Sequence, residues 1–435
     1  MTKIEQQTLA LVGGLPIRTK SWPTWPRYDK GTETILIDVL RSNRWAISGM
    51  YNGKPTYERR FSEDFAKFTG VPYCVPVCNG SAALVVALQA LGVGYGDEVL
   101  VPGIVWVACS SAVTRIGGIP IMVDVEPDTL CMSLDAATNA INSKTKAILL
   151  VHLYSAIADI DGFVKLSKKT SVPLIEDCSQ AHGAKWNDQY VGTFGEIGVF
   201  STQDSKLLTS GEGGIIITRD EKLFRKISQL RADGRMYLEK PPVIGEQELE
   251  ELGEVQGYNY CMSEFHAAIL LDRLPHLTEE NNLRLENATF LDEMLQNIGG
   301  LSPLRKLPQV SLPTFYHYCI RVNLEEFGNI NIDLLRKAVM AELNTFMEPV
   351  DDPHNNNLIY NPLISSRTSP EHKERLNPKQ FSLPNCEMAK RVSLVFHHPL
   401  LLDSSLGMED IAQTFIKIKS NLKQLRSIQN DIERK

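Results

Sequence analysis

The stretch FSTQDSKLLTSGEGG, residues 200–214, places a single lysine, Lys206, between the end of an apolar run and a series of glycines. Apolar segments flank it on both sides, GVFST ahead of it and GGIIIT behind it. Short apolar runs bounded by Gly and Ser predict buried strands. A lysine at such a strand end can be a surface charge, a phosphate ligand or a covalent nucleophile, and the surrounding sequence has to distinguish these roles.

Strands and helices alternate around this stretch, from about residue 75 to residue 220. SAALVVALQALG predicts a buried helix that begins near Ser81 and ends at Gly92. Further strands are predicted in DEVLVP (97–102), IPIMVDV (119–125), KAILLVHL (146–153) and VPLIED (172–177). This alternation predicts an α/β fold with a mostly parallel sheet covered by helices on both faces. Ligands in such sheets bind at the carboxyl ends of the strands.

The pattern changes after residue 275, so we expect a large domain over residues 1–275 and a smaller C-terminal α+β domain over residues 276–435. Residues 278–298 and 331–343 predict helices, and residues 315–324 alternate like a half-buried strand. Residues 408–428 predict one long terminal helix. The segment 347–385 is rich in Pro, Asn and Ser, which predicts an irregular excursion near the surface and a candidate substrate loop.

Composition excludes several classes of protein. The chain has 435 residues, 43% hydrophobic and 22% charged, and a net charge of −7, which does not favour nucleic acid or an anionic membrane as a partner. No apolar stretch is long enough for a signal peptide or a membrane span, so we expect a cytoplasmic protein. The eight cysteines form no CxxC pair and no zinc spacing, which predicts buried thiols and no metal site.

Three further signals accompany Lys206. Asp177 ends an apolar strand, where an aspartate is commonly only a cap or a loop acid. Gly80 and Ser81 open a helix whose free amides suit a phosphate, although a plain helix cap explains them as well. Trp106 follows a Pro-Gly break and is either a core residue or a stacking surface for a planar ring. GxGxxG and GxxxxGK[ST] motifs are absent from the sequence, which argues against dinucleotides and nucleoside triphosphates.

Together these signals describe one cofactor, pyridoxal 5′-phosphate. The amine of Lys206 would bond to the aldehyde, and the carboxylate of Asp177 would keep the ring nitrogen protonated, so that the ring can accept electrons. Gly80 and Ser81 would hold the phosphate, and Trp106 would stack on the ring. The sequence therefore predicts an enzyme that uses pyridoxal phosphate.

The chain also resembles a known family. The motifs NGSAAL, GDEVLVPGIVWVA, VHLY, IEDCSQAHGA, FSTQDSKLLTSGEGG and GYNYCMSEFHAAI are similar, in this order, to those of the DegT-type (DegT/DnrJ/StrS) sugar aminotransferases. The resemblance implies the fold type I of pyridoxal-phosphate-dependent transferases, which is like that of aspartate aminotransferase. It implies that Lys206 is the Schiff-base lysine and Asp177 the partner of the pyridinium.

The same resemblance implies further contacts with the cofactor. Gln180 would contact the ring hydroxyl, and Ser201 would join the phosphate site. Asn259, in GYNY, would reach the phosphate from the other subunit, which implies an obligate homodimer with shared active sites. Without the family, a turn or cap role for Asn259 is equally reasonable.

Within the family, WPTWPRYD (22–29), SNRWAISG (42–49) and FHHPLLL (396–402) resemble the L-glutamine:2-deoxy-scyllo-inosose and scyllo-inosose aminotransferases. On that match, the candidate residues of the substrate pocket are Arg44, Trp45, Tyr237, His397 and His398. The two histidines can equally be a structural pair at a strand end. Gln203 stands where nucleotide-sugar members often carry His, and FMEPVDDPHNNN (346–357) departs from the pattern of the inosose enzymes.

The expected function is therefore transfer of an amino group from L-glutamine or L-glutamate to a keto-cyclitol or keto-sugar, in aminoglycoside or other secondary-metabolite biosynthesis. One alternative is a nucleotide-linked keto-sugar as the acceptor. Another is a dehydrating enzyme like 3-amino-5-hydroxybenzoate synthase. A cofactor-binding regulator without turnover is disfavoured, because such a role does not require both Lys206 and Asp177.

Overall fold

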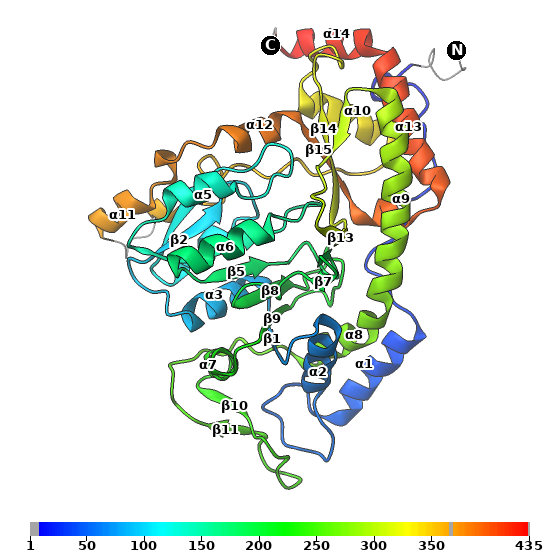
Figure 1. The fold of residues 1–435 in the computed structure, drawn as a ribbon. Coiled ribbons are helices and arrows are strands. Elements are labelled where there is room, and N and C mark those ends of the chain that lie inside the picture. The colour runs from blue at the N-terminus through cyan, green and yellow to red at the C-terminus, as the bar shows by residue number, and fades with distance from the viewer. Residues whose placement is uncertain (1–7, 365–368, 434–435) are drawn as a thin grey trace.

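The computed structural model describes residues 8–364 and 369–433, and a seven-stranded sheet lies at its centre (Figure 1). The strands, in their order across the sheet, are β1 (Tyr73–Val77), β9 (Gly214–Thr218), β8 (Ile197–Ser201), β5 (Leu174–Asp177), β4 (Thr145–Val151), β2 (Glu98–Pro102) and β3 (Ile119–Val123). Strand β9 pairs antiparallel with both neighbours, and the remaining pairs are parallel. The prediction of a mainly parallel α/β sheet is confirmed.

Helices cover this sheet, which explains why its strands are apolar without alternation. The helices that follow the strands are α3 (Gly80–Ala90), α4 (Ala108–Arg115), α5 (Leu134–Ala140), α6 (Ile160–Thr170) and α7 (Glu221–Arg231). Helix α3 contacts α4, α7 and the strands β1, β8 and β9, while α5 and α6 pack together and lie in front of the sheet in Figure 1. Nearly every position of β2, β4 and β9 is buried as a result.

Smaller elements flank the sheet. Helices α1 (Lys30–Ser42) and α2 (Tyr57–Thr69) both pack against α8 (Glu264–Arg273). Strands β10 (Arg235–Tyr237) and β11 (Leu249–Glu251) form a hairpin, and β13 (Val310–Leu312), β6 (Lys185–Trp186) and β7 (Gln189–Tyr190) form a small antiparallel sheet. The 22-residue helix α9 (Leu277–Ile298) runs from this region to the C-terminal part of the chain (Figure 1).

The C-terminal part has a three-stranded antiparallel sheet of its own. Its strands are β12 (Leu301–Pro303), β14 (His317–Val322) and β15 (Ser393–His397), and its helices include α10 (Ile332–Leu343) and α12 (Pro384–Val392). The expected half-buried alternation of β14 is wrong, because this central strand is buried on both faces. Tyr318 and Ile320 pack into the C-terminal core, whereas Cys319 packs into the core around the large sheet.

The expected single terminal helix is also wrong. The structure has two helices, α13 (Ser405–Ser420) and α14 (Leu422–Glu433), separated at Asn421. The side-chain amide of Asn421 donates to the carbonyl of Lys417 at 2.8 Å, and its backbone N–H bonds to Ile418 in a tighter turn. An asparagine side chain that competes with the backbone in this way ends a helix that the apolar periodicity alone would continue.

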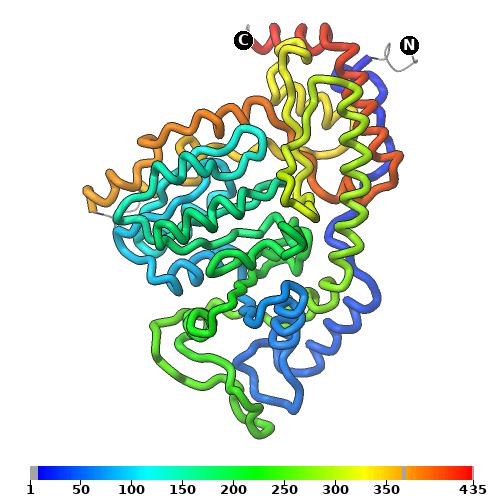
Figure 2. The backbone as a smooth tube through the Cα atoms, viewed as in Figure 1, coloured from blue at the N-terminus to red at the C-terminus, as the bar shows by residue number. Residues whose placement is uncertain are grey.

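The segment that begins the chain packs on the segment that ends it. In Figure 2 the blue N-terminal tube runs beside the red C-terminal helices, and Leu9 belongs to the same apolar cluster as Phe415. Arg18 forms ion pairs with Asp403 at 2.6 Å and Asp410 at 3.0 Å. Residues 9–22 therefore pack with the C-terminal part, although the intervening chain builds the large sheet.

The segment 347–385 is irregular at first, as predicted, and then includes α11 (Pro370–Leu376). Its expected place near the surface is wrong for its first part. Val350, His354 and Tyr360 are buried, and Val350 and Tyr360 join the apolar core around the large sheet. Close contact of this segment with the loop before α4 brings it beside the carboxyl ends of the strands.

None of the helices in the described ranges combines the length and the apolar character needed to cross a membrane.

The buried ion pair between Lys417 of α13 and Glu342 of α10 also holds the N-terminal segment, so its loss should lower stability. Glu342 is fully buried and accepts hydrogen bonds from the amide of Ala10 at 2.8 Å and from Lys417 Nζ at 2.8 Å. We expect Lys417→Met to lower the free energy of unfolding by about 3–5 kcal/mol, because it leaves a buried carboxylate unpaired. Lys419→Met, at a partly exposed position of the same helix, should cost less than about 1 kcal/mol in the same urea titration.

Candidate active site

The carboxyl ends of the parallel strands meet at one edge of the sheet and line a cavity of about 620 Å³. Cavities of this size hold a cofactor together with a small substrate. Seven of the residues expected at the cofactor line it: Gly80, Ser81, Trp106, Asp177, Gln180, Ser201 and Lys206. They lie at or after the ends of four strands, β1, β2, β5 and β8, so the fold brings together residues that the sequence separates by more than 120 positions.

One end of the cavity is suited to a phosphate. Asn79 caps α3 by accepting a hydrogen bond from the amide of Ala82 at 2.8 Å. The amides of Gly80 and Ser81 have no acceptor within the described part of the chain, and the N-terminus of a helix favours an anion. A Cβ atom on Gly80 would lie 2.7 Å from Cβ of Ser201, so only glycine lets the helix end approach this serine.

The carboxylate of Asp177 is held in a fixed orientation. The amide of Ser179 donates to Oδ1 at 2.9 Å, and the thiol of Cys109 donates to Oδ2 at 3.5 Å. Burial raises the pKa of the Cys109 thiol well above its ordinary value, and the nearby carboxylate of Asp177 raises it further. The thiol therefore stays protonated and can donate. The sequence did not single out Cys109, because a cysteine in an apolar helix reads as a core residue.

Trp106 and Gln180 present free surfaces to the cavity. The Trp106 side chain is 57% exposed, so it is not the core residue that the sequence also allowed. The side-chain oxygen of Gln180 accepts a hydrogen bond from the amide of Tyr154 at 2.6 Å, which leaves its NH₂ group as a donor. An exposed indole and an oriented amide donor suit a planar ring with a hydroxyl.

Lys206 projects into the cavity from the loop after β8. Its amide donates to the carbonyl of Gln203 at 2.8 Å, and its Nζ lies 3.9 Å from the centre of the Tyr316 ring. Ser205, the preceding residue, is held by the side chains of Gln203 and Tyr316 at 2.8 Å each. This turn fixes the start of the lysine side chain, whose amine lies over the Tyr316 ring in the cavity that Asp177 also lines.

Several polar residues of the cavity were missed by the sequence. They are Cys109, Tyr154, Tyr316, His317, Glu348 and Asp351. Tyr154 follows β4, so the strand-end rule could have identified it. Glu348 and Asp351 come from the irregular segment after α10, and no strand or helix pattern indicates where such a segment lies.

The other predicted residues do not line this cavity. Arg44 is buried in an ion pair with Glu248, and the hydroxyl of the half-buried Tyr237 donates to Glu58 at 2.7 Å. Trp45 is exposed beside Phe265, and Asn259 is exposed on the surface of its own chain. These four residues therefore contribute nothing to the cofactor cavity of the chain that carries them.

His397 and His398 lie near the cavity without lining it. His397 lines a neighbouring cavity together with Trp25, His317 and Glu348, whereas His398 is fully buried. Nε2 of each ring lies 3.0–3.1 Å from the carbonyl of Ser205. Both rings thus support the turn that carries Lys206, which matches the structural alternative for this pair.

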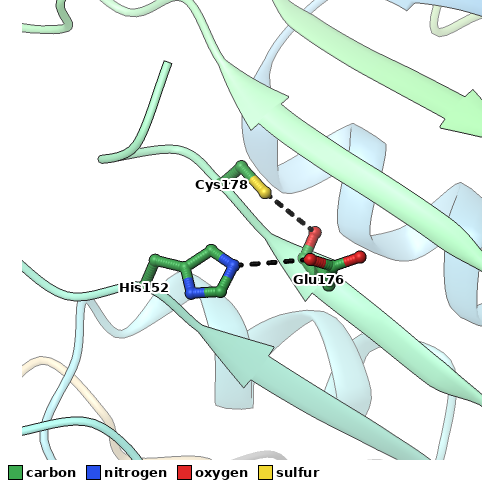
Figure 3. A group of neighbouring side chains, drawn as sticks. All are labelled: His152, Glu176 and Cys178. Atoms are coloured by element: carbon green, nitrogen blue, oxygen red, sulfur yellow. Dashed lines mark hydrogen bonds and ion pairs between the residues drawn. The ribbon is translucent and has the colours of Figure 1, made fainter. Parts of the chain in front are cut away.

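A second cluster of titratable groups, His152, Glu176 and Cys178, lies beneath this edge of the sheet (Figure 3). The Glu176 carboxylate accepts hydrogen bonds from the amides of Gly192, Phe194 and Gly195 at 2.7–2.9 Å. His152 Nδ1 accepts from the amide of Ala158, so its proton is on Nε2, 3.5 Å from Glu176. Since the Glu176 carboxylate is already engaged by three amides, we assign this cluster to holding the loop after β7.

Fold and cavity together define a class of protein. A mainly parallel sheet, a lysine and an anchored carboxylate at one cavity, and free helix amides for a phosphate are the features of a fold type I transferase that uses pyridoxal phosphate. Residues 29–394 match the family described as the DegT/DnrJ/EryC1/StrS aminotransferase family. The chain belongs to this family, and the prediction of a pyridoxal-phosphate-dependent aminotransferase is confirmed.

Individual relatives are similar over almost their whole length. The L-glutamine:2-deoxy-scyllo-inosose aminotransferase of Micromonospora echinospora is 45% identical over 424 residues, covering 96% of this chain and 99% of that protein. The enzyme of the same name from Streptoalloteichus tenebrarius is 43% identical over 421 residues, with the same coverage. The crystal structure of 3-amino-5-hydroxybenzoic acid synthase superposes with a TM-score of 0.77 at 27% identity, covering 92% of this chain and 99% of that one.

His354 makes the stability of the cavity wall depend on pH. Its Nε2 donates to the carbonyl of Val105 at 2.8 Å, its Nδ1 accepts from the Ser110 hydroxyl at 2.7 Å, and burial lowers its pKa from 6.5 to about 4. Between these two values the unfolded chain binds a proton at this residue and the folded chain does not, so stability falls as the pH drops.

We expect this single group to lower the free energy of unfolding by about 1.4 kcal/mol per pH unit between pH 6.5 and 4. Urea unfolding as a function of pH measures the slope. His354→Gln removes the titrating group and should flatten the profile by that amount, whatever its effect on stability at pH 7. The control is His276→Gln at a half-exposed ring. An unchanged slope in the His354 variant contradicts the assignment.

Proposed function

We propose that the chain transfers the amino group of L-glutamine to a keto-cyclitol, 2-deoxy-scyllo-inosose or a close analogue, in aminoglycoside biosynthesis. The main support for amino-group transfer is that Lys206 and Asp177 line the same cavity. The identity of 43–45% over almost the full length with enzymes named for these substrates supports the donor and the acceptor.

Pyridoxal phosphate, when bound, supplies an aldehyde that bonds to amines and a ring that takes up electrons from an adjacent carbon. In our proposal the amides of Gly80 and Ser81 and the hydroxyl of Ser201 hold the phosphate. Trp106 covers a ring face, and the amide of Gln180 donates to the ring hydroxyl. Asp177, oriented by Ser179 and Cys109, would accept a hydrogen bond from the protonated ring nitrogen and keep it protonated.

Lys206 then has two roles in turn. Its Nζ anchors the cofactor until the donor amino acid replaces it. The freed amine would take the proton from Cα of the donor and deliver it to the cofactor carbon that carried the aldehyde, so that the proton is not lost to solvent. The turn formed by Gln203, Ser205 and Tyr316 keeps the amine within reach, and the same steps in reverse aminate the ketone.

A direct assay tests this proposal. With pyridoxal phosphate, L-glutamine and 2-deoxy-scyllo-inosose, we expect ping-pong kinetics and an aminated cyclitol that mass spectrometry identifies without loss of water. Lys206→Ala should lose the absorption band of the imine with the cofactor and lower kcat by at least about 10³-fold, because both the anchor and the base are lost. Lys222→Ala, at an exposed position of α7, is the control. A Lys206→Ala protein that stays yellow and turns over excludes the assignment.

We also propose that the enzyme acts as a homodimer with shared active sites. Asn259 is exposed on its own chain and outside its own cavity, and the family resemblance implies that it reaches the phosphate of the other subunit. Trp45 is a second exposed candidate for the facing subunit.

Subunit mixing measures this sharing. Lys206→Ala and Asn259→Ala should each impair every site of their own homodimers. A dimer with one subunit of each kind has one site with both residues intact, so an unfolded and refolded equal mixture should recover about one quarter of the wild-type activity, provided that exchange is random. As a control, Lys206→Ala mixed with wild type shows how much activity is lost when active subunits are only diluted by inactive ones. Activity no higher than the sum of the two separate variants contradicts a shared site.

A further inference from the structure

The segment that follows α10 carries two carboxylates, Glu348 and Asp351, to the mouth of the cavity. Neither belongs to the cofactor site described above, and FMEPVDDPHNNN is the stretch in which this chain departs from the expected family pattern. Glu348, Pro349 and Asp351 line the same cavity as Lys206.

The segment is held rigidly against the cofactor site. The amide of His354 donates to the carbonyl of Gly103 at 2.8 Å, and its ring bridges Val105 and Ser110. The hydroxyl of Tyr360 lies 3.1 Å from Thr114 Oγ1. These contacts fix the segment to the loop and helix that also carry Trp106 and Cys109, so the position of Asp351 relative to the cofactor site is set by the fold.

The carboxylate of Asp351 has one oxygen engaged and one available. Tyr154 donates its hydroxyl hydrogen to Oδ2 at 3.1 Å, and the amide of Asp351 donates to the same hydroxyl oxygen at 3.2 Å. Oδ1 has no hydrogen-bond partner in the part of the chain that the structure describes. Burial raises the pKa of Asp351, while the Tyr154 hydrogen bond and the charge of Lys206 lower it, which indicates that its carboxylate lies within electrostatic reach of the catalytic amine.

His317 adds an unsatisfied polar group to this wall. Its ring is buried and lines the cavity, Nε2 lies 3.8 Å from Glu348, and Nδ1 has no partner among the described residues. Burial lowers its pKa well below 6.5, so the ring is neutral and offers one donor and one acceptor. A buried imidazole with a free nitrogen is costly unless a ligand completes its hydrogen bonds.

The charges of the cavity favour an uncharged ligand. The acidic side chains that line it are Asp177, Glu212, Glu348 and Asp351, and Lys206 is the basic one. Lys206 is committed to the reaction, so no other lysine or arginine among the described residues that line this cavity is available to bind a diphosphate. Carboxylates accept hydrogen bonds from hydroxyl groups, and such charge-assisted bonds are stronger than neutral ones.

We propose that Asp351, together with Glu348, selects the amino acceptor by accepting hydrogen bonds from ring hydroxyls of an uncharged polyhydroxylated cyclic ketone, and that these carboxylates disfavour acceptors carrying phosphate. This inference rests on the proposed aminotransferase function and deepens it. Asp351 is the main determinant because it is half-buried, is oriented by Tyr154 and lines the same cavity as Lys206, whereas the side chain of Glu348 is 65% exposed.

The test separates the two half-reactions of the cofactor-bound enzyme. Asp351→Asn keeps the shape and an oxygen for Tyr154, and Asp352→Asn is the matched control, because the neighbouring carboxylate pairs with Lys390 instead. We expect Asp351→Asn to leave conversion of L-glutamine within about threefold and to lower kcat/KM for 2-deoxy-scyllo-inosose by about 10- to 100-fold, the value of a hydrogen bond to a charged group. Cyclohexanone, which has no hydroxyls, should show no such loss.

A binding measurement gives a readout independent of turnover. In calorimetry, the Kd of the aminated cyclitol should rise by a similar factor in Asp351→Asn and stay unchanged in Asp352→Asn. Equal losses in both half-reactions, or the same loss with cyclohexanone, overturn the inference, because they identify Asp351 as a support for Tyr154 only.

The acceptor panel distinguishes this inference from the proposed function. If the wild type prefers another uncharged polyhydroxylated ketone to 2-deoxy-scyllo-inosose, the named acceptor is wrong while the role of Asp351 stands. If it prefers a nucleotide-linked keto-sugar, the inference itself is wrong.

Discussion

The parallel pairing of β5 with β8 is the constraint on which the site depends. It places Asp177 opposite Val199, two residues before Ser201, so the Asp177 carboxylate and the Ser201 hydroxyl lie at the same edge of the sheet. Antiparallel pairing would send one of them to the far edge, more than a strand length away. The loop after β8 then needs only five residues to bring Lys206 back over Asp177.

The supporting contacts of the cavity come from parts of the chain that are distant in sequence. The turn that carries Lys206 is held from one side by Tyr316 and from the other by His397 and His398, at the junction with the C-terminal sheet. That sheet is in turn held by α9 and α13, which pack against each other and against the N-terminal segment. Asp177 and Lys206 thus come from the large sheet and the loop that follows it, while residues at the C-terminal sheet support the turn of Lys206.

Seven of the eight residues predicted at the cofactor line one cavity, because they lie at the carboxyl ends of strands or open a helix, and the carboxyl ends of parallel strands converge. Sequence patterns failed where a polar residue interrupted a regular period, as at Asn421, or where a strand faced two cores, as β14 does. They also failed for Asp351, since an irregular segment has no period from which its path can be deduced.

The sequence by itself determined the class of enzyme. The cofactor chemistry requires a lysine and a carboxylate at strand ends, and these appear in the sequence as local features: a lysine followed by glycines, an aspartate after an apolar run, and the spacing of the strands. Tertiary structure alone decided which groups form the remaining wall of the cavity. Tyr154, His317 and Asp351 meet there because long-range packing, through the buried imidazole of His354 and the C-terminal sheet, brings together segments separated by almost 200 residues.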